Sequence, residues 1–211
     1  MQWILQIPAL FFSIIIHEFG HGYIAYKKGD DTAYLSGRLT LNPVLHIDLI
    51  GTIILPGLSL ITGAPLIGWA KPVPVNPYRM NDPYRDMVYV AAAGPSFNII
   101  LSAVSIVFLN ILVAIGFSKF RIIVPLILIL QFMVYINLML AFFNLLPVYP
   151  LDGGQILLNI LPYSYREKYE RIIPYGMYII IFLVATGIIK YWVIIPMNLT
   201  IKFYNLLGLY V

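Results

Sequence analysis

Long apolar runs, separated by short polar stretches, dominate the chain. Four of these runs are long enough to cross a bilayer as helices, since about 20 apolar residues span the hydrocarbon core. They cover approximately residues 3–26, 87–117, 122–144 and 172–189. The tail, residues 191–211, is also apolar but is interrupted by Pro196, Lys202 and Gly208. A further crossing helix and a helix lying at the membrane surface are equal alternatives for this tail.

One apolar segment, from His46 to Leu66, contains too many glycines and prolines to form a single helix. In the stretch after it, Trp69 to Pro77, proline alternates with valine, which favours extended backbone. Irregular backbone is tolerated at membrane depth only where protein shields it. We therefore predict an all-α polytopic membrane protein. It is a bundle of about five to six transmembrane helices with a re-entrant or strand-like insertion between the first and second core helices.

The composition supports a location in the lipid bilayer. Of 211 residues, 61% are hydrophobic and only 10% are charged, whereas about 25% are charged in an ordinary soluble domain. This composition argues against a nucleic-acid-binding protein and a disordered chain. The absence of cysteine excludes disulfide scaffolds and thiol catalysis.

The basic residues predict an orientation. We place the N-terminus outside and let the insertion re-enter from the inside. Nine of the 13 basic residues then fall on the inner side, as expected for cytoplasmic loops. These nine are Lys27, Lys28, Arg38, Lys71, Arg79, Arg85, Arg166, Lys168 and Arg171. The sequence therefore predicts a multi-pass protein of the cell membrane.

The first apolar run contains the sequence His17-Glu18-Phe19-Gly20-His21. Residues four apart share one face of a helix, so His17 and His21 can present two imidazole nitrogens to one ion. Glu18 can reach a water on that ion, which is the H-E-x-x-H arrangement of zinc metalloproteases. The alternative is a chance match. Two of only three histidines at this spacing inside a membrane helix favour metal binding, because unliganded polar groups there are costly.

A catalytic zinc ion usually has three protein ligands and one position open to water. The candidates for the third ligand are Asp152, Asp48 and His46. The predicted topology brings Asp152 to the depth of the two histidines, but a role as helix N-cap is an equal alternative for it. For His46 and Asp48, a structural hydrogen-bonded role is favoured over metal ligation.

Motif-like blocks of the sequence lie at residues 17–22, 41–48, 68–77, 93–98 and 144–154. These blocks resemble the site-2 protease family of intramembrane zinc metalloproteases (peptidase family M50). The resemblance is to its small prokaryotic members and covers roughly residues 10 to 160. Tyr149 and Gln155 depart from the residues common in this family, but neither is a proposed ligand.

The resemblance implies one zinc ion held by His17, His21 and Asp152, with a water as the fourth ligand. Glu18 is then the general base that takes a proton from the water and returns it to the leaving amine. The resemblance also implies that Asn144 and Asn98 lie near the zinc, where an amide could stabilise the developing oxyanion. The alternative for each asparagine is a hydrogen bond between helices. No motif surrounds Asn137 or Asn110, for which we expect structural roles.

The implied activity is regulated intramembrane proteolysis, the hydrolysis of peptide bonds within or near transmembrane segments of protein or peptide substrates. We expect a single domain over residues 1–211, with a catalytic core of about 3–161 and C-terminal helices within 172–211. The extended stretch Val73 to Val75 could hold an unwound substrate by strand addition. A proton or ion transporter is a competing interpretation, but the sequence shows no inverted halves. A catalytically silent relative is another, although every proposed catalytic residue is present.

Overall fold

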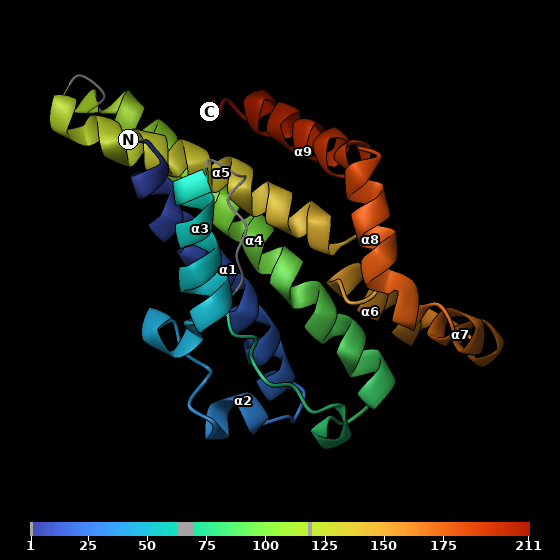
Figure 1. Ribbon diagram of the computed structural model, residues 1–211. Helices are drawn as coiled ribbons and strands as arrows, with labels where there is room; N and C mark the ends of the chain where they lie inside the picture. Colours follow the sequence, from blue (N-terminus) through green and yellow to red (C-terminus); the bar gives the residue numbers. More distant parts are fainter. Residues whose placement is uncertain (1, 63–69, 118–119) are drawn as a thin grey trace.

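A computed structural model of the protein describes residues 2–62, 70–117 and 120–211. Three long helices form its centre and pack against one another (Figure 1). These are α1 (Gln2–Lys27), α4 (Pro83–Ala114) and α5 (Val124–Asn144). Each is long and apolar enough to cross a membrane.

Shorter elements surround this three-helix centre. The helices are α2 (Thr32–Leu35), α3 (Leu55–Thr62), α6 (Asp152–Ile160), α7 (Tyr163–Glu170), α8 (Gly176–Ala185) and α9 (Ile189–Leu206). There are 3-10 turns at Pro43–His46, Pro77–Arg79, Arg121–Ile123 and Ile173–Tyr175 and a π-helical turn at Leu49–Ile54. α6 packs on α4, and α9 packs on α5.

Helix α4 is the longest element and organises the others. It begins after Asp82, whose side chain accepts a hydrogen bond from the Arg85 N–H, and Pro83 occupies its first turn. α4 runs antiparallel to α1, since His21 contacts Val90 near the start of α4 whereas His17 contacts Asn98 about two turns later. Their shared interface therefore fixes which α4 residues lie beside the two histidines.

The C-terminal part of the chain runs the length of α4. The Arg166 guanidinium lies 4.1 Å from the ring centroid of Tyr84, in the first turn of α4. At the other end of α4, Asn110 exchanges two hydrogen bonds with the backbone of Tyr210. Figure 1 accordingly shows both chain termini toward the same end of the bundle. Buried Tyr204 joins Ile106, Val134 and Leu138 in the apolar core there.

The all-α membrane bundle predicted from the sequence is confirmed, but the number of crossing helices differs. Among the described residues, three helices meet the length and hydropathy requirements, or four if a pair bent by 72° counts as one span. The part of the chain that the structure describes offers no fifth or sixth crossing, because α8 has only ten residues and continues through this bend into α9.

The insertion between α1 and α4 is irregular, as expected, but forms no strand in the described part of the chain. It begins with α2 and several short helical turns, and α3 follows Asp48 and the π-helical turn. Residues 70–76 then return toward α4 without regular secondary structure. The end of the predicted apolar segment and Trp69 lie in 63–69, outside the described residues.

Candidate metal centre

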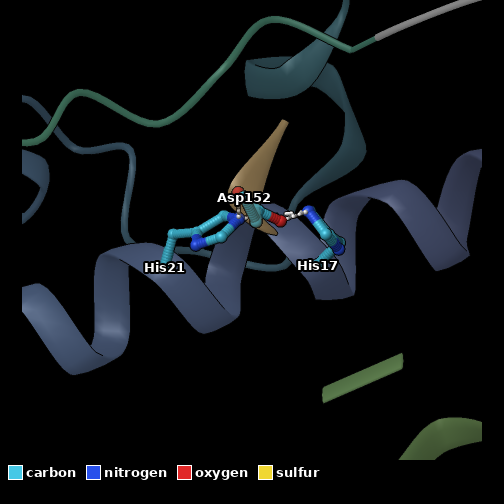
Figure 2. Close-up of side chains that lie close together, drawn as sticks. All are labelled: His17, His21 and Asp152. Atoms are coloured by element: carbon cyan, nitrogen blue, oxygen red, sulfur yellow. Dashed lines mark hydrogen bonds and ion pairs between the residues drawn. The ribbon is translucent and has the colours of Figure 1, made fainter. Parts of the chain in front are cut away.

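Three side chains from two distant parts of the sequence converge beside α1. His17 and His21 lie one turn apart on α1, and Asp152 is the first residue of α6 (Figure 2). The two Nε2 atoms are 3.0 Å apart. Asp152 Oδ2 lies 3.1 Å from Nε2 of His17, and Asp152 Oδ1 lies 3.4 Å from Nε2 of His21.

This arrangement fits a small divalent cation. Zinc bonds of about 2.0–2.2 Å in tetrahedral geometry place neighbouring ligand atoms about 3.3–3.6 Å apart, close to the distances in this cluster. Asp152 Oδ2 is shielded from solvent yet accepts no hydrogen bond from the described residues. Two imidazoles and one carboxylate are also a ligand set that suits zinc.

Both imidazole rings are held from behind by α4. The Nδ1 atom of His21 is 2.8 Å from the Val90 carbonyl oxygen, and Nδ1 of His17 is 2.6 Å from Oδ1 of Asn98. Because a carbonyl oxygen only accepts, each Nδ1 carries the proton and donates. Each Nε2 is therefore left with its lone pair directed toward the cluster, as a metal ligand requires.

Two glycines allow the helices to approach this closely. A Cβ atom on Gly94, midway between Val90 and Asn98, would collide with the imidazoles of both His17 and His21. A Cβ atom on Gly153 would collide with the Leu145 and Leu146 carbonyls at the end of α5. Gly94 thus makes room for the rings, and Gly153 lets α6 start where Asp152 reaches them.

Glu18 is connected to the irregular segment before α4. Its Oε2 accepts a hydrogen bond of 2.8 Å from the Val73 N–H. No hydrogen bond from a described residue reaches its other oxygen, Oε1. One carboxylate oxygen is therefore anchored, and the other remains without a hydrogen-bond partner among the described residues.

The same segment is fixed to the rest of the insertion on both sides of Val73. Arg38 Nη2 donates to the carbonyl oxygens of Lys71 and Pro72, at 2.8 and 3.2 Å. The Lys71 N–H donates to the His46 carbonyl, and the Asn76 N–H donates to Oδ2 of buried Asp30. These contacts hold the backbone of residues 71–76 beside Glu18.

The remaining candidates from the sequence lie away from the cluster or play another part. Buried His46 donates from Nε2 to the Thr40 carbonyl, and Asp48 caps the π-helical turn by accepting from the Ile50 and Gly51 N–H groups. Asn144 donates to the Leu140 carbonyl one turn earlier. No described hydrogen bond links Asn144 to either histidine or to Asp152.

Asn98 lies at the site, but its amide N–H groups point away from the cluster. They donate to the Ser13 carbonyl and to Asn137 Oδ1. These contacts leave no N–H group for an oxyanion, so they fit the alternative role of a contact between helices.

Sequence reasoning missed the groups that support the histidines and Glu18. Val73, Val90 and Arg38 act through backbone atoms or contact backbone atoms, and no motif marks such roles. Ser13 and Asn137 did carry a signal, since polar side chains within apolar membrane helices usually have a specific purpose.

Comparison with known proteins identifies several relatives. The family model described as peptidase family M50 matches residues 114–187. The Bacillus subtilis protein named "Putative zinc metalloprotease YwhC" is 38% identical over 183 residues, or 86% of this chain and 80% of the relative. The Methanocaldococcus jannaschii protein named "Zinc metalloprotease MJ0392" is 26% identical over 163 residues, or 77% of this chain and 36% of the relative. No solved structure gives a significant match.

Proposed function

The chain belongs to peptidase family M50, and from this premise we propose that it cleaves peptide bonds within or near transmembrane segments of membrane-protein substrates. Membership makes the protein a zinc metalloprotease with zinc as its cofactor. The proposal extends this to the residues that perform the reaction, to the substrates and to the orientation in the membrane.

His17, His21 and Asp152 are the proposed ligands of a single zinc ion. The observation that carries the proposal is the convergence of their ligand atoms, all within 4.8 Å of one another. The ligands come from α1 and from the start of α6, so the site exists only when the bundle is folded. Zinc, when bound, acidifies a coordinated water and polarises a carbonyl.

Glu18 is the proposed general base and acid. It follows the ligand His17 directly, and the Val73 N–H fixes one of its oxygens. The open Oε1 then takes a proton from the attacking water and later delivers it to the leaving amine. Holding the carboxylate in one orientation keeps this oxygen within reach of both positions.

The segment around Val73 is the proposed binding site for the substrate backbone. A substrate helix must unwind before its carbonyl can be attacked, because its carbonyls are occupied by helical hydrogen bonds. Val73 already directs its N–H toward Glu18. In extended backbone, Val75 presents its N–H on the same edge as Val73, so an unwound substrate can pair with this edge.

The protein is proposed to be multi-pass, with the site toward the cytoplasm. Lys27 and Lys28, at the end of α1, and Arg85, at the start of α4, lie at the same end of the bundle. Basic residues gather on the cytoplasmic side of membrane proteins. His21 is less than two turns from Lys27, so the cluster lies nearer this end of α1.

The test measures zinc content and cleavage of a model transmembrane substrate by the wild type and Glu18→Gln. General acid–base catalysis contributes about 10²–10⁴ in rate, so Glu18→Gln should lose at least about 10²-fold in kcat while it keeps zinc. His17→Ala, His21→Ala and Asp152→Ala should each lose zinc. Glu170→Gln, the same change on the exposed face of α7, is the matched control and should behave as the wild type. Full activity of Glu18→Gln would refute its proposed role.

A further inference from the structure

Three fully buried polar side chains form a chain of hydrogen bonds in the apolar centre of the bundle. Ser13 belongs to α1, Asn98 to α4 and Asn137 to α5, and each has 0% relative exposure. Polar groups inside a membrane helix bundle are costly unless every donor and acceptor is used. This chain connects all three long helices and ends on His17.

The hydrogen bonds run in one direction. The Ser13 hydroxyl donates to the Ala9 carbonyl at 2.8 Å, so its oxygen accepts from Nδ2 of Asn137 at 2.9 Å. Oδ1 of Asn137 accepts from Nδ2 of Asn98 at 2.7 Å. Oδ1 of Asn98 then accepts from Nδ1 of His17 at 2.6 Å.

The second amide proton of each asparagine is also used. Asn98 Nδ2 donates to the Ser13 carbonyl, and Asn137 Nδ2 donates to the Met133 carbonyl. Flipping the Asn98 amide would place its oxygen against the Ser13 carbonyl oxygen and Asn137 Oδ1, which are both acceptors. The surrounding bonds therefore require Asn98 to turn an oxygen, and not an N–H, toward His17.

We propose that Asn98, oriented by Asn137 and Ser13, is a positioning residue that keeps the His17 proton on Nδ1 and directs Nε2 to the metal. This inference rests on the proposed zinc site. Hydrogen bonds to the second nitrogen of a ligating histidine fix its tautomer and ring orientation, and their loss typically costs about 10–100-fold in metal affinity.

The two histidines differ in how they are held. His21 donates to the Val90 carbonyl, a backbone acceptor whose direction α4 itself determines. His17 donates to a side-chain amide, which could present either an oxygen or an N–H group. Only His17 therefore needs additional residues to orient the amide that it donates to. This explains why the buried series of hydrogen bonds lies on the His17 side of the cluster and not on the His21 side.

The first measurement is the zinc affinity of the full-length protein in detergent, by competition with a chelator. Asn98→Leu should weaken zinc binding by about 10–100-fold. Asn98→Asp keeps an acceptor oxygen facing His17 and should bind zinc at least several-fold more tightly than Asn98→Leu. Asn110→Leu is the matched control, because Asn110 lies on the same helix but contacts Ile106 and Tyr210. It should bind zinc as the wild type does.

A milder pair of variants tests the same proposal if Asn98→Leu does not fold. Ser13→Ala removes the acceptor of Asn137 and should weaken zinc binding by about 2- to 10-fold, as expected for one lost neutral hydrogen bond. Ser105→Ala removes a buried hydroxyl whose one described hydrogen bond is to the Leu101 carbonyl of its own helix, and should leave zinc affinity unchanged.

The second measurement follows the ring protons by NMR of the zinc-loaded protein with ¹⁵N-labelled histidine. The chain has three histidines, so substitutions assign the signals. His17 and His21 should carry protected protons on Nδ1, and His46, which donates from Nε2, is an internal reference of the other tautomer. Asn98→Leu should make the His17 proton exchange faster with water and leave the His21 and His46 signals unchanged.

The outcomes separate this inference from the proposed function. If zinc leaves the His17 and His21 signals unchanged in the wild type, the proposed metal site is wrong. If zinc shifts these signals but Asn98→Leu and Asn110→Leu have the same affinity, only the role of Asn98 is overturned. Equal affinity of Asn98→Asp and Asn98→Leu overturns it as well, because the acceptor oxygen then makes no difference.

Discussion

At the scale of single residues, the position of the two imidazoles depends on Gly94 as much as on the spacing of the histidines along α1. It lies on the α4 face between the two groups that hold the rings, where any side chain would collide with both of them. Interiors are packed too tightly to absorb such a collision without strain. The exclusion of a side chain at position 94 is therefore part of how the cluster is built.

Gly94→Ala should weaken zinc binding by about fivefold or more, since overpacking costs about 1–3 kcal/mol. The chelator competition measures this loss. Gly57→Ala makes the same chemical change in α3, where a Cβ atom would meet nothing within 4 Å. It should leave zinc affinity unchanged, and equal affinities for the two variants would show that α4 can move away from the rings.

The residues proposed to carry the chemistry are those that the sequence marks by their spacing along one helix or by a motif. His17 and His21 are four residues apart, and helix geometry alone brings them together. The residues behind the rings depend on the register between α1 and α4, which local sequence does not determine. The placement of Asn98 near the metal was implied by the family resemblance, with an oxyanion contact and a bond between helices as its alternatives. The direction of its amide follows from this register, which turns its oxygen toward His17.

At the scale of elements, local sequence predicts the backbone conformation of the segment from Lys71 to Asn76 but not its position in the fold. Its prolines predict that it is not helical, and the structure agrees. Its position is set by side chains distant in sequence, namely Glu18, Arg38 and Asp30. No local pattern encodes such contacts, so the sequence did not reveal that Glu18 and this segment are joined.

Proline substitutions at two neighbouring positions separate the two proposed tasks of this segment. Val73→Pro removes the N–H that holds Glu18 and should lower kcat. Val75→Pro removes an N–H proposed to pair with the substrate and should raise KM. Both variants should keep their zinc. Steady-state cleavage of a model transmembrane substrate, with zinc content measured in parallel, provides the test.

Val75→Ala is the control for this pair, because Val75 also packs against the cluster of Ala25, Met80 and Val90. The alanine variant loses this packing but keeps the backbone N–H, so its KM should stay near that of the wild type. A KM raised equally in Val75→Ala and Val75→Pro would attribute the effect to packing and exclude strand pairing at this position.

At the scale of the whole molecule, the composition sufficed to predict a helical membrane bundle but not the number of crossings. Hydropathy made residues 172–189 a crossing of their own, whereas the structure bends the chain by 72° between α8 and α9. Gly187 lies at this bend with a φ of +70°, a conformation that favours glycine. Its sequence signal is only one glycine in an apolar run, which is also compatible with a continuous helix.

The path of the chain after α6 predicts four crossings in total. Arg166 lies at Tyr84 and Tyr210 at Asn110, 26 residues apart on α4. That separation is about 39 Å at 1.5 Å per residue, so α8 and α9 together traverse the bundle once. With α1, α4 and α5, this fourth crossing returns the C-terminal end to the side of the N-terminus, which the basic residues place outside.

Reporter fusions test this topology in cells. Alkaline phosphatase fused after Val211 should be active and green fluorescent protein fused there should be dark, because the phosphatase requires the outer side and the fluorophore the inner side. Fusions after Lys168, in α7 beside the start of α4, should give the opposite pattern. The same pattern at both positions would mean that α8 and α9 do not cross together, and the C-terminal part of the chain would then lie on the membrane surface.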